Sequence, residues 1–154
     1  MLVRALEPRD LDAWAAMRGA LWPDEDIEEL RRECADYCTP GTSRLLEAIF
    51  VAETSGGALR GFVELSLRPY ADGCRSSPVP FVEGWYVAPG ARREGVGGAL
   101  IAAGEAWAKD GGYTEIASDA LIENIISIGA HAALGFEEVE RAVRFRKTLK
   151  PGDQ

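Results

Sequence analysis

The order of apolar and polar residues along the first half of the chain predicts strands and helices. A short alternating segment comes first, and apolar side chains then recur at helical spacing from Leu11 to Leu21. Two later segments are rich in β-forming residues, and the Ser-Gly-Gly of residues 55–57 between them predicts a hairpin. The elements expected here are a strand at 2–6, a helix opened by residues 7–10, an acidic helix at 24–38, and strands at 47–54 and 58–67.

The second half begins with a polar, proline-containing loop at 68–80, whose length favours a binding role. Glycines at 111–112 and 135 are expected to end two helices. The elements expected here are a strand at 80–88, a turn rich in glycine and arginine at 89–98, a helix through Asp110, a strand at 114–118, a helix at 123–134 and a final strand at 136–149. This order predicts an α/β sheet of mixed direction in a single domain over 1–150, with 151–154 as a short tail.

The turn at 89–98 carries the most informative motif, Arg-x-x-Gly-x-Gly, which starts at Arg92. Glycines at 95, 97 and 98 let the backbone approach a ligand, and the N–H groups of a helix's first turn favour an anion such as pyrophosphate. The other interpretation is a loop that needs glycine only for its turns. Neither the six-residue dinucleotide fingerprint nor the lysine-containing nucleoside triphosphate loop is present.

In its strand-loop-helix context, this motif resembles the pyrophosphate loop of the GCN5-related N-acetyltransferase (GNAT) superfamily, and the resemblance extends over nearly the whole chain. It implies a mixed, mostly antiparallel sheet of about six to seven strands flanked by about four helices. It also implies that a bulged, splayed strand pair holds acetyl-CoA as acetyl donor, with no metal. The cofactor-binding residues implied are Tyr86 and Val87 at the pantetheine arm, and Arg92, Arg93, Gly95, Val96, Gly97 and Gly98 at the pyrophosphate.

Two residues of the next predicted helix also bear on the cofactor. The family places an Asn at the start of that helix and, seven residues later, a Tyr near the thiol. Asn124 matches this pattern, whereas His131 stands where the Tyr would be. His131 is expected either to hydrogen-bond the sulfur or to pack at the helix end. A thiol, with an ordinary pKa of about 8.5, leaves readily as thiolate, so an acid is dispensable.

Five further segments are similar to those of the aminoglycoside 6′-N-acetyltransferases, and they begin at Leu21, Tyr70, Phe81, Ala117 and Gly135. The similarity implies a drug pocket formed in part across the interface of a homodimer. The substrate-binding residues implied are Trp22, Tyr70, Asp72, Glu83, Asp119 and Glu140.

Each of these positions has a second interpretation. Glu83 interrupts an apolar strand, so it either faces solvent or serves the neck of the cofactor cleft. Asp119 follows a strand on the side where sheet ligands bind, yet it also suits an N-cap. Glu140 lies in the predicted final strand, where a solvated edge explains it equally well. Trp22 suits either the core or a platform for substrate, although Trp14 already serves the apolar face of its helix.

Charge and cysteine content narrow the choice of partners. The net charge of −8 disfavours nucleic acid and anionic membranes and favours a cationic partner. The apolar runs are too short to span a bilayer and the N-terminus lacks the layout of a secretion signal, which predicts a cytoplasmic protein. Three cysteines predict reduced thiols, and a single histidine argues against a zinc site at Cys34 and Cys38.

These features predict an enzyme that uses acetyl-CoA to acetylate the 6′-amine of an aminoglycoside antibiotic, which would confer resistance. We expect direct transfer in a ternary complex, with Asp119 or Glu83 accepting the proton, through water if needed, and a backbone N–H near Val87 polarising the carbonyl. A Cys74 acyl intermediate is disfavoured because its loop has no histidine or basic dyad nearby in sequence. The alternatives are a GNAT enzyme for another cationic amine (a polyamine, a protein N-terminus or an amino-acid derivative) and a non-catalytic acetyl-CoA sensor.

Overall fold

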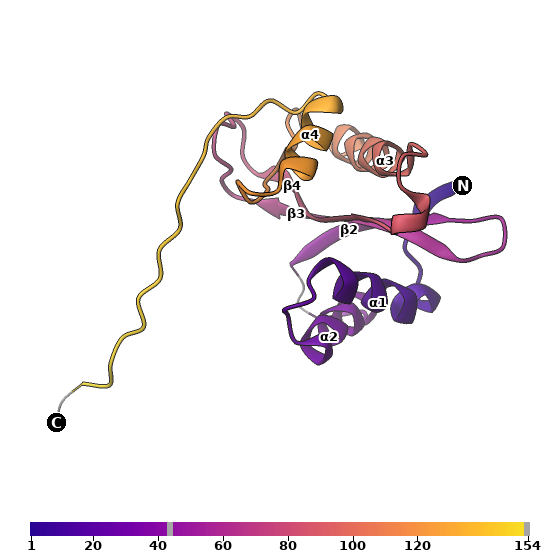
Figure 1. Cartoon of the computed structure of the whole chain (residues 1–154), viewed down its shortest axis with the longest axis horizontal. Helices are drawn as coiled ribbons and strands as arrows, with labels where there is room; N and C mark the ends of the chain where they lie inside the picture. Colours follow the sequence, from indigo (N-terminus) through magenta and orange to yellow (C-terminus); the bar gives the residue numbers. More distant parts are fainter. Residues whose placement is uncertain (43–44, 153–154) are drawn as a thin grey trace. The chain divides into compact units, whose positions relative to one another are not determined.

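The computed structural model describes residues 1–42 and 45–152, which fall into two compact units (Figure 1). The first unit is Met1–Asp119 and the second begins at Ala120. The prediction of a single domain over 1–150 is not tested by this division and stays a prediction. Within the described residues, no helix is both long and apolar enough to cross a membrane.

The first unit is built on a five-stranded sheet in which spatial order follows chain order. Neighbouring strands are antiparallel from β1 to β4, and β5 runs parallel to β4. The predicted hairpin at 55–57 is confirmed, because it joins β2 to β3. The strands are β1 (Leu2–Ala5), β2 (Leu46–Glu53), β3 (Leu59–Arg68), β4 (Val79–Val87) and β5 (Ala117–Ser118).

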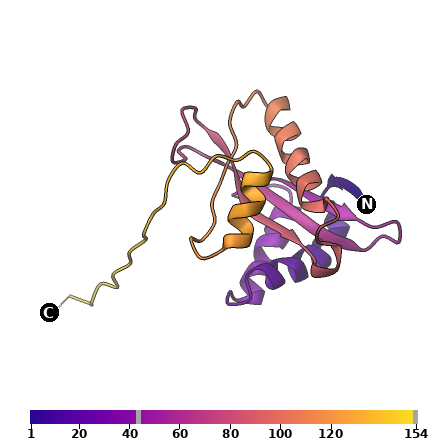
Figure 2. The same ribbon diagram turned by 45° about the horizontal axis from the view of Figure 1, so that its top comes forward.

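Helices cover both faces of this sheet. The helices α1 (Leu11–Leu21) and α2 (Ile27–Cys38) lie on one face, and α3 (Val96–Asp110) lies on the other (Figures 1 and 2). Short 3-10 turns at Pro8–Asp10 and Pro89–Ala91 lead into α1 and into the loop before α3. The core on the α1 face centres on Trp14 and Phe62, which are fully buried. Burial of these large aromatic side chains fixes α1 to the sheet.

A β-bulge in β4 adds one residue and interrupts the alternation of side chains along the strand. Val82 pairs with Leu65 of β3 and Gly84 pairs with Glu64, so Glu83 is an additional residue opposite β3. A bulge of this kind places two successive side chains on one face. Glu83 and Gly84 therefore both face α1 and α2, and the residues that follow, from Trp85 onward, alternate from that new starting point.

The same strand separates from its other neighbour. The pairing of β4 with β5 consists of Phe81 with Ala117 and Val82 with Ser118. Beyond Val82, the described residues place no strand against that edge of β4. This open edge over Glu83–Val87 agrees with the predicted splayed strand pair.

The second unit contains α4 (Ile125–Ala133), which completes the four predicted helices. The expected final strand at 136–149 is wrong, because residues 136–152 form no strand in the structure. The count of about six to seven strands is therefore too high, and the strand expected at 114–118 is reduced to Ala117–Ser118.

The reason for the missing final strand lies in what a strand requires. Alternating apolar residues favour a strand, but a strand also needs a neighbour that completes its hydrogen bonds. In this single chain the apolar side chains of the segment stay exposed: Val139 at 57%, Val143 at 74%, Phe145 at 92% and Leu149 at 80%.

Candidate active site

The predicted phosphate loop leads directly into α3. The residue before the helix, Gly95, has φ +80°, and Arg93 also has a positive φ of 65°. The first intrahelical backbone bond runs from Ala99 N–H to the Gly95 carbonyl, so the amides of Val96, Gly97 and Gly98 precede the helix's own bonding pattern. These amides and the positive end of the helix dipole can hold the linked phosphates of a coenzyme.

Gly97 has a structural role in addition to the predicted contact with phosphate. A Cβ atom on Gly97 would lie 3.2 Å from the ring of Trp85, and Trp85 Nε1 donates a hydrogen bond to the Gly97 carbonyl (3.2 Å). Trp85 thus anchors the start of α3 to β4. Side-chain packing alone thus favours glycine at position 97, and its predicted contact with phosphate stays a prediction.

The open edge of β4 presents backbone groups beside this loop. Ala88 N–H donates to the Arg60 carbonyl on β3 (2.8 Å), and hydrogen-bonded positions alternate along an antiparallel pair. Trp85 and Val87 therefore direct their backbone groups toward the open edge. Arg92 Nε donates to the Val87 carbonyl (2.9 Å), and the Val87 N–H is directed to the same open edge. The predicted contact of Val87 with the cofactor stays a prediction.

Asn124 and His131 belong to the second unit. The Asn124 side chain caps α4 by accepting a hydrogen bond from Ser127 N–H (3.0 Å). Nδ1 of His131 lies 2.7 Å from the Ser127 carbonyl, and its ring packs edge-on against Phe136 with a centroid distance of 5.1 Å. The His131 contacts agree with its helix-end interpretation, and the roles of both residues at the cofactor stay predictions.

A cavity of about 690 Å³ lies on the α1–α2 face of the sheet. Two of the six predicted acceptor residues meet there, since Trp22 and Glu83 both line it. With Glu83, its lining contains four carboxylates and two arginines, an excess of negative charge that favours a cation. The lining residues are Arg18, Trp22, Glu33, Asp36, Tyr37, Leu45, Leu46, Glu64, Ser66, Leu67, Arg68, Pro69 and Glu83.

The floor of the cavity is a buried ion pair between α1 and β3. Arg18 is 4% exposed and Glu64 is 1% exposed. Arg18 donates from Nε to Oε2 of Glu64 (3.1 Å) and from Nη2 to Oε1 (3.2 Å), and Trp14 Nε1 also donates to Oε2 (3.2 Å). Burial raises the pKa of Glu64, whereas the Arg18 charge and the hydrogen bonds from Arg18 and Trp14 oppose that rise. The pair thus closes the bottom of the cavity with its charges neutralised.

Trp22 packs against the Arg18 side of this ion pair. The Arg18 guanidinium lies 5.1 Å from the Trp22 ring centroid, which places a cation against the aromatic face. A Cβ atom on Gly84 would lie 2.9 Å from Cη2 of Trp22 and 3.0 Å from Cγ of Glu64. Gly84 therefore leaves the room that Trp22 occupies. Trp22 lines the cavity and is half-buried, so it serves both as packing and as wall.

The carboxylate of Glu83 enters the same cavity because of the bulge. It accepts hydrogen bonds from Ser66 Oγ (2.6 Å) and from Nε and Nη2 of Arg68 (both 2.8 Å). Burial alone would raise the pKa of Glu83, but the hydrogen bonds from Arg68 and Ser66 and the Arg68 charge outweigh burial and hold the pKa below its ordinary value. Glu83 is therefore paired within this cavity, and its predicted role at the neck of the cofactor cleft stays a prediction.

The loop between β3 and β4 is held in place by hydrogen bonds to Glu115, which lies outside the loop. The Glu115 carboxylate accepts hydrogen bonds from the Arg75 and Ser76 backbone N–H groups and from Ser76 Oγ, at 2.9, 2.7 and 2.5 Å. Tyr70 and Asp72 are exposed residues of this loop. The predicted contacts of Tyr70 and Asp72 with a drug stay predictions.

Asp119 and Glu140 end the set of predicted acceptor residues. Asp119 directly follows β5, and its charge is among those that raise the pKa of Arg68. Glu140 lies in the segment that forms no strand, where it is exposed. The strand position predicted for Glu140 is therefore wrong, and its contact with substrate stays a prediction.

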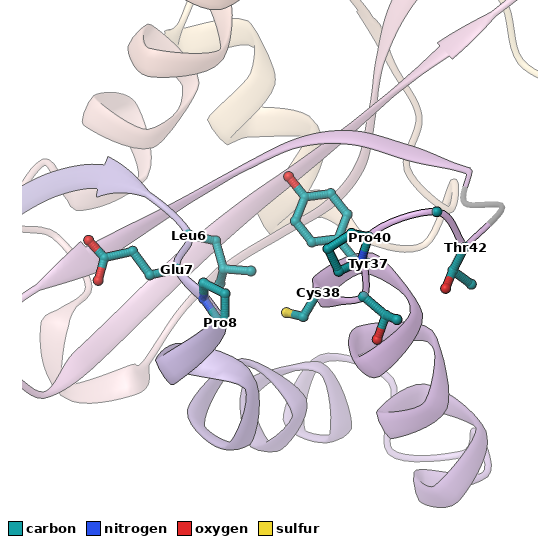
Figure 3. Close-up of a pocket in the computed structure, with 9 residues that line it drawn as sticks. Leu6, Glu7, Pro8, Tyr37, Cys38, Pro40 and Thr42 are labelled. Atoms are coloured by element: carbon teal, nitrogen blue, oxygen red, sulfur yellow. The ribbon is translucent and has the colours of Figure 1, made fainter.

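A second hollow, of about 470 Å³, has Tyr37 in common with the first cavity but is not lined by these carboxylates (Figure 3). Figure 3 shows Leu6 and Pro8, from the connection between β1 and α1, facing Tyr37, Cys38 and Pro40 at the end of α2. Among the described residues no group of three or more metal-ligating side chains occurs, and none of the three cysteines forms a disulfide. This hollow lacks the clustered charges that a polycationic acceptor requires.

Four residues that shape the cavity were not predicted as site residues: Arg18, Glu64, Ser66 and Arg68. A signal was available for the first two, because opposite charges stand on the apolar face of a helix and inside an apolar strand. Buried charges occur almost only as pairs. No comparable signal marked Arg68, because its position beside Glu83 depends on the bulge.

The open strand edge, the phosphate loop beside it and the acidic cavity on the opposite face together define the class of protein as a coenzyme A-dependent acyltransferase. The chain belongs to the acetyltransferase (GNAT) family, whose family model matches residues 10–136. This family membership confirms the predicted GNAT fold.

Several curated proteins that are similar to this chain share one name. The chain is 47% identical to an aminoglycoside N(6')-acetyltransferase type 1 from Klebsiella aerogenes, over 96% of this chain and 97% of that protein. It is 46% identical to the protein of the same name from Stenotrophomonas maltophilia, over 97% and 94%. A solved structure of AAC(6')-Iy in complex with the bisubstrate analogue CoA-S-monomethyl-acetylneamine has a TM-score of 0.86 at 38% identity and covers 96% of this chain and 98% of that chain.

Proposed function

We propose that this protein transfers the acetyl group of acetyl-CoA to the 6′-amine of an aminoglycoside antibiotic and thereby confers resistance. The observation that carries the proposal is the near full-length identity of 46–47% to aminoglycoside N(6')-acetyltransferases. The acidic cavity behind β4 supports it, because an aminoglycoside is a polycation and several carboxylates around one cleft attract it.

In this proposal the open edge of β4 receives the donor. The pyrophosphate binds at Gly95–Gly98, and the pantetheine arm extends along the edge as an added strand would. The Val87 N–H, which is directed to that edge, polarises the thioester carbonyl and stabilises the oxyanion that forms when the amine attacks. Asn124 and His131 are proposed as further cofactor contacts from the second unit.

The acceptor must lose a proton before it can attack. For an alkylamine with a pKa near 10.4, holding the neutral form at pH 7 costs about 4–5 kcal/mol, which neighbouring ammonium groups of the sugar reduce. Because Arg68 and Ser66 lower the pKa of Glu83, we assign Glu83 to anchoring the substrate cation. We assign proton acceptance to Asp119, directly or through water.

A direct transfer fits the cysteines of this chain better than a covalent relay. Burial and the nearby Glu115 carboxylate raise the pKa of the Cys74 thiol, and burial raises the pKa of Cys34 to about 12. A thiol with a raised pKa is a poor nucleophile at neutral pH because the thiolate is the reactive form. The reaction is therefore proposed to proceed in a ternary complex, in the cytoplasm.

We further propose that the enzyme works as a homodimer. The support comes from the second unit, in which α4 buries none of its residues and Ile125 and Ile126 are 77% and 87% exposed. The alternating apolar segment at 136–149 is also exposed, so a second copy would cover it and complete its hydrogen bonds. Light scattering of the full chain that reports a monomer at working concentration would contradict this.

The experiment for the proposed function follows coenzyme A release with kanamycin or tobramycin as acceptor, and then with analogues that lack the 6′-amine. We expect turnover only with the amine present, and product mapping should place the acetyl group at that nitrogen. Turnover with spermidine or an N-terminal peptide, and none with the drugs, would assign the chain to another cationic acceptor. Coenzyme A binding without turnover on any amine would make it a sensor.

Substitutions at the two carboxylates separate their proposed roles. Asp119→Asn should lower kcat by about 10²- to 10⁴-fold, as loss of a general base does, with little change in KM for the drug. Glu83→Gln should mainly raise that KM. The opposite pattern would exchange the two roles, and ping-pong kinetics would refute direct transfer.

A further inference from the structure

The acceptor cavity already contains a cation that belongs to the protein. Arg68 binds Glu83 through two parallel hydrogen bonds, from Nε to Oε1 and from Nη2 to Oε2, each 2.8 Å long. The guanidinium also lies 3.6 Å from the centroid of the Phe81 ring. A fork on a carboxylate, with an aromatic ring at its face, is the geometry in which arginine binds most selectively.

The remaining acidic lining residues show why this pair matters. Glu64 and Glu33 are both bound to Arg18, which is buried and cannot leave the floor. The Arg68 and Glu83 side chains, in contrast, are 41% and 27% exposed. Glu83 therefore has a partner that is able to move into solvent, as Arg side chains do at little cost.

The charge of a second predicted site residue also acts on Arg68. The hydrogen bond to Glu83, with the charges of Glu83 and Asp119, raises the pKa of Arg68 above its ordinary value against the effect of burial. Both carboxylates that are assigned to the acceptor amine thus interact with Arg68 when no acceptor is bound. An incoming ammonium group and the Arg68 guanidinium compete for the Glu83 oxygens, which Arg68 contacts directly.

We propose that Arg68 is an internal counter-ion of the acceptor site, which a substrate ammonium must displace from Glu83, and that this exchange selects acceptors with several positive charges. The proposal rests on the proposed function, because it takes the same cavity as the acceptor site.

The selectivity follows from the balance of the exchange. An acceptor with one amine only replaces one cation on Glu83 by another and gains little. An acceptor with several amines also reaches other carboxylates, such as Asp36 in the cavity wall, and these contacts offset the loss of the Arg68 pair. Arg68 therefore weakens the binding of every cation at Glu83. Only compounds with a single amine are excluded, because they gain no other contact.

The test measures binding rather than turnover. Wild-type protein, Arg68→Gln and Arg68→Lys are loaded with coenzyme A and titrated by calorimetry with kanamycin and with 6-amino-6-deoxyglucose, which has one amine. Arg32→Gln, an exposed arginine of α2 outside the cavity lining, removes the same charge and is the matched control. Coenzyme A affinity should be the same in all four proteins.

We expect Arg68→Gln to bind kanamycin about 3- to 10-fold more tightly than wild type, and to show a larger relative gain for the single-amine sugar. Arg68→Lys should lie between, because it keeps the charge but loses the fork. Unchanged affinity, or weaker binding with a lower kcat, would overturn the proposal, and weaker binding would indicate that Arg68 holds Glu83 in position for the substrate.

A measurement on the wild-type protein covers the case in which Arg68→Gln does not fold. The NMR signal of the Arg68 Nε proton should shift when kanamycin is added to the coenzyme A complex and stay unchanged when coenzyme A alone is added. An unchanged signal with bound kanamycin would overturn the exchange. Absence of drug acetylation by wild type, with the affinity changes still present, would refute the proposed function and leave the cation exchange standing.

Discussion

Substitution of Arg18 should show how strongly the stability of the protein depends on the ion pair at the floor of the acceptor cavity. In Arg18→Met the Glu64 carboxylate, which is 1% exposed, keeps only the hydrogen bond from Trp14 among its described donors, and the Leu30 carbonyl loses the Arg18 Nη1 donor at 2.9 Å. Breaking a buried pair by removing one partner costs about 3–5 kcal/mol. That loss is a large part of the roughly 5–15 kcal/mol by which a domain is stable.

The loss should depend on pH in a defined direction. Without Arg18, burial raises the folded-state pKa of Glu64 further above its ordinary value of 4.5. The folded variant then binds a proton that the unfolded chain does not, so its stability falls as pH rises through the interval between the two pKa values. Above the ordinary value of 4.5, the deficit relative to wild type should grow with pH, by at most about 1.4 kcal/mol per pH unit.

Urea unfolding at several pH values provides the measurement, with the free energy of unfolding obtained by linear extrapolation. The double variant Arg18→Met/Glu64→Gln should recover about 2 kcal/mol or more of the loss, because it removes the uncompensated charge. Arg31→Met, which breaks an exposed pair with Asp12, is the control and should change little. A deficit under about 1 kcal/mol, or one that does not shrink at low pH, would refute a buried charge pair.

Two further predictions follow from backbone geometry and from an acidic residue. Gly95→Ala should lower the free energy of unfolding by about 1–2 kcal/mol, because φ is +80° there, and should also weaken coenzyme A binding in calorimetry. Gly112→Ala has the same strain at φ +85° and should leave coenzyme A affinity unchanged; equal losses in both would remove the phosphate role of Gly95. The hydrogen bond from Arg4 holds the pKa of Asp10 below its ordinary value of 3.8 despite burial, so this stabilisation is present above that value and is lost as pH falls through the lower folded-state value. Acid unfolding should therefore be less steep in Asp10→Asn than in wild type, and identical curves would contradict this.

The elements predicted most accurately were those whose sequence contains both the pattern and the signal that ends it. The α3 helix follows the Gly95 turn and stops before Gly111, and the hairpin at 55–57 has the glycines that its turn requires. The motif at Arg92 identified the cofactor class because its chemistry is local. Consecutive backbone amides form a phosphate site without help from distant residues.

The parts that were missed depend on pairing between distant segments. The alternation at 136–149 predicts a strand, but no rule on that segment alone states which edge it would join. The partnership of Arg18 with Glu64 was within reach, because each charge stands in an apolar pattern that it should not occupy alone. Glu83 was named as a site residue, whereas Arg68, its partner, became visible only when the register of β3 and β4 was known.

The additional residue in β4, Glu83, brings a carboxylate into the acceptor cavity, so the number of residues in this strand matters for the proposed chemistry. Deleting one residue between Val82 and Trp85 would restore regular alternation and leave Trp85 opposite Val63 on the α3 face, so the indole that anchors the phosphate loop would keep its position. The deletion would instead remove one of the two successive side chains that face α1 and α2. Point substitutions in β4 before Glu83 also leave that anchor in place. The acceptor cavity can therefore change by substitution, or by loss of the bulge residue, while the anchor of the donor loop stays in place.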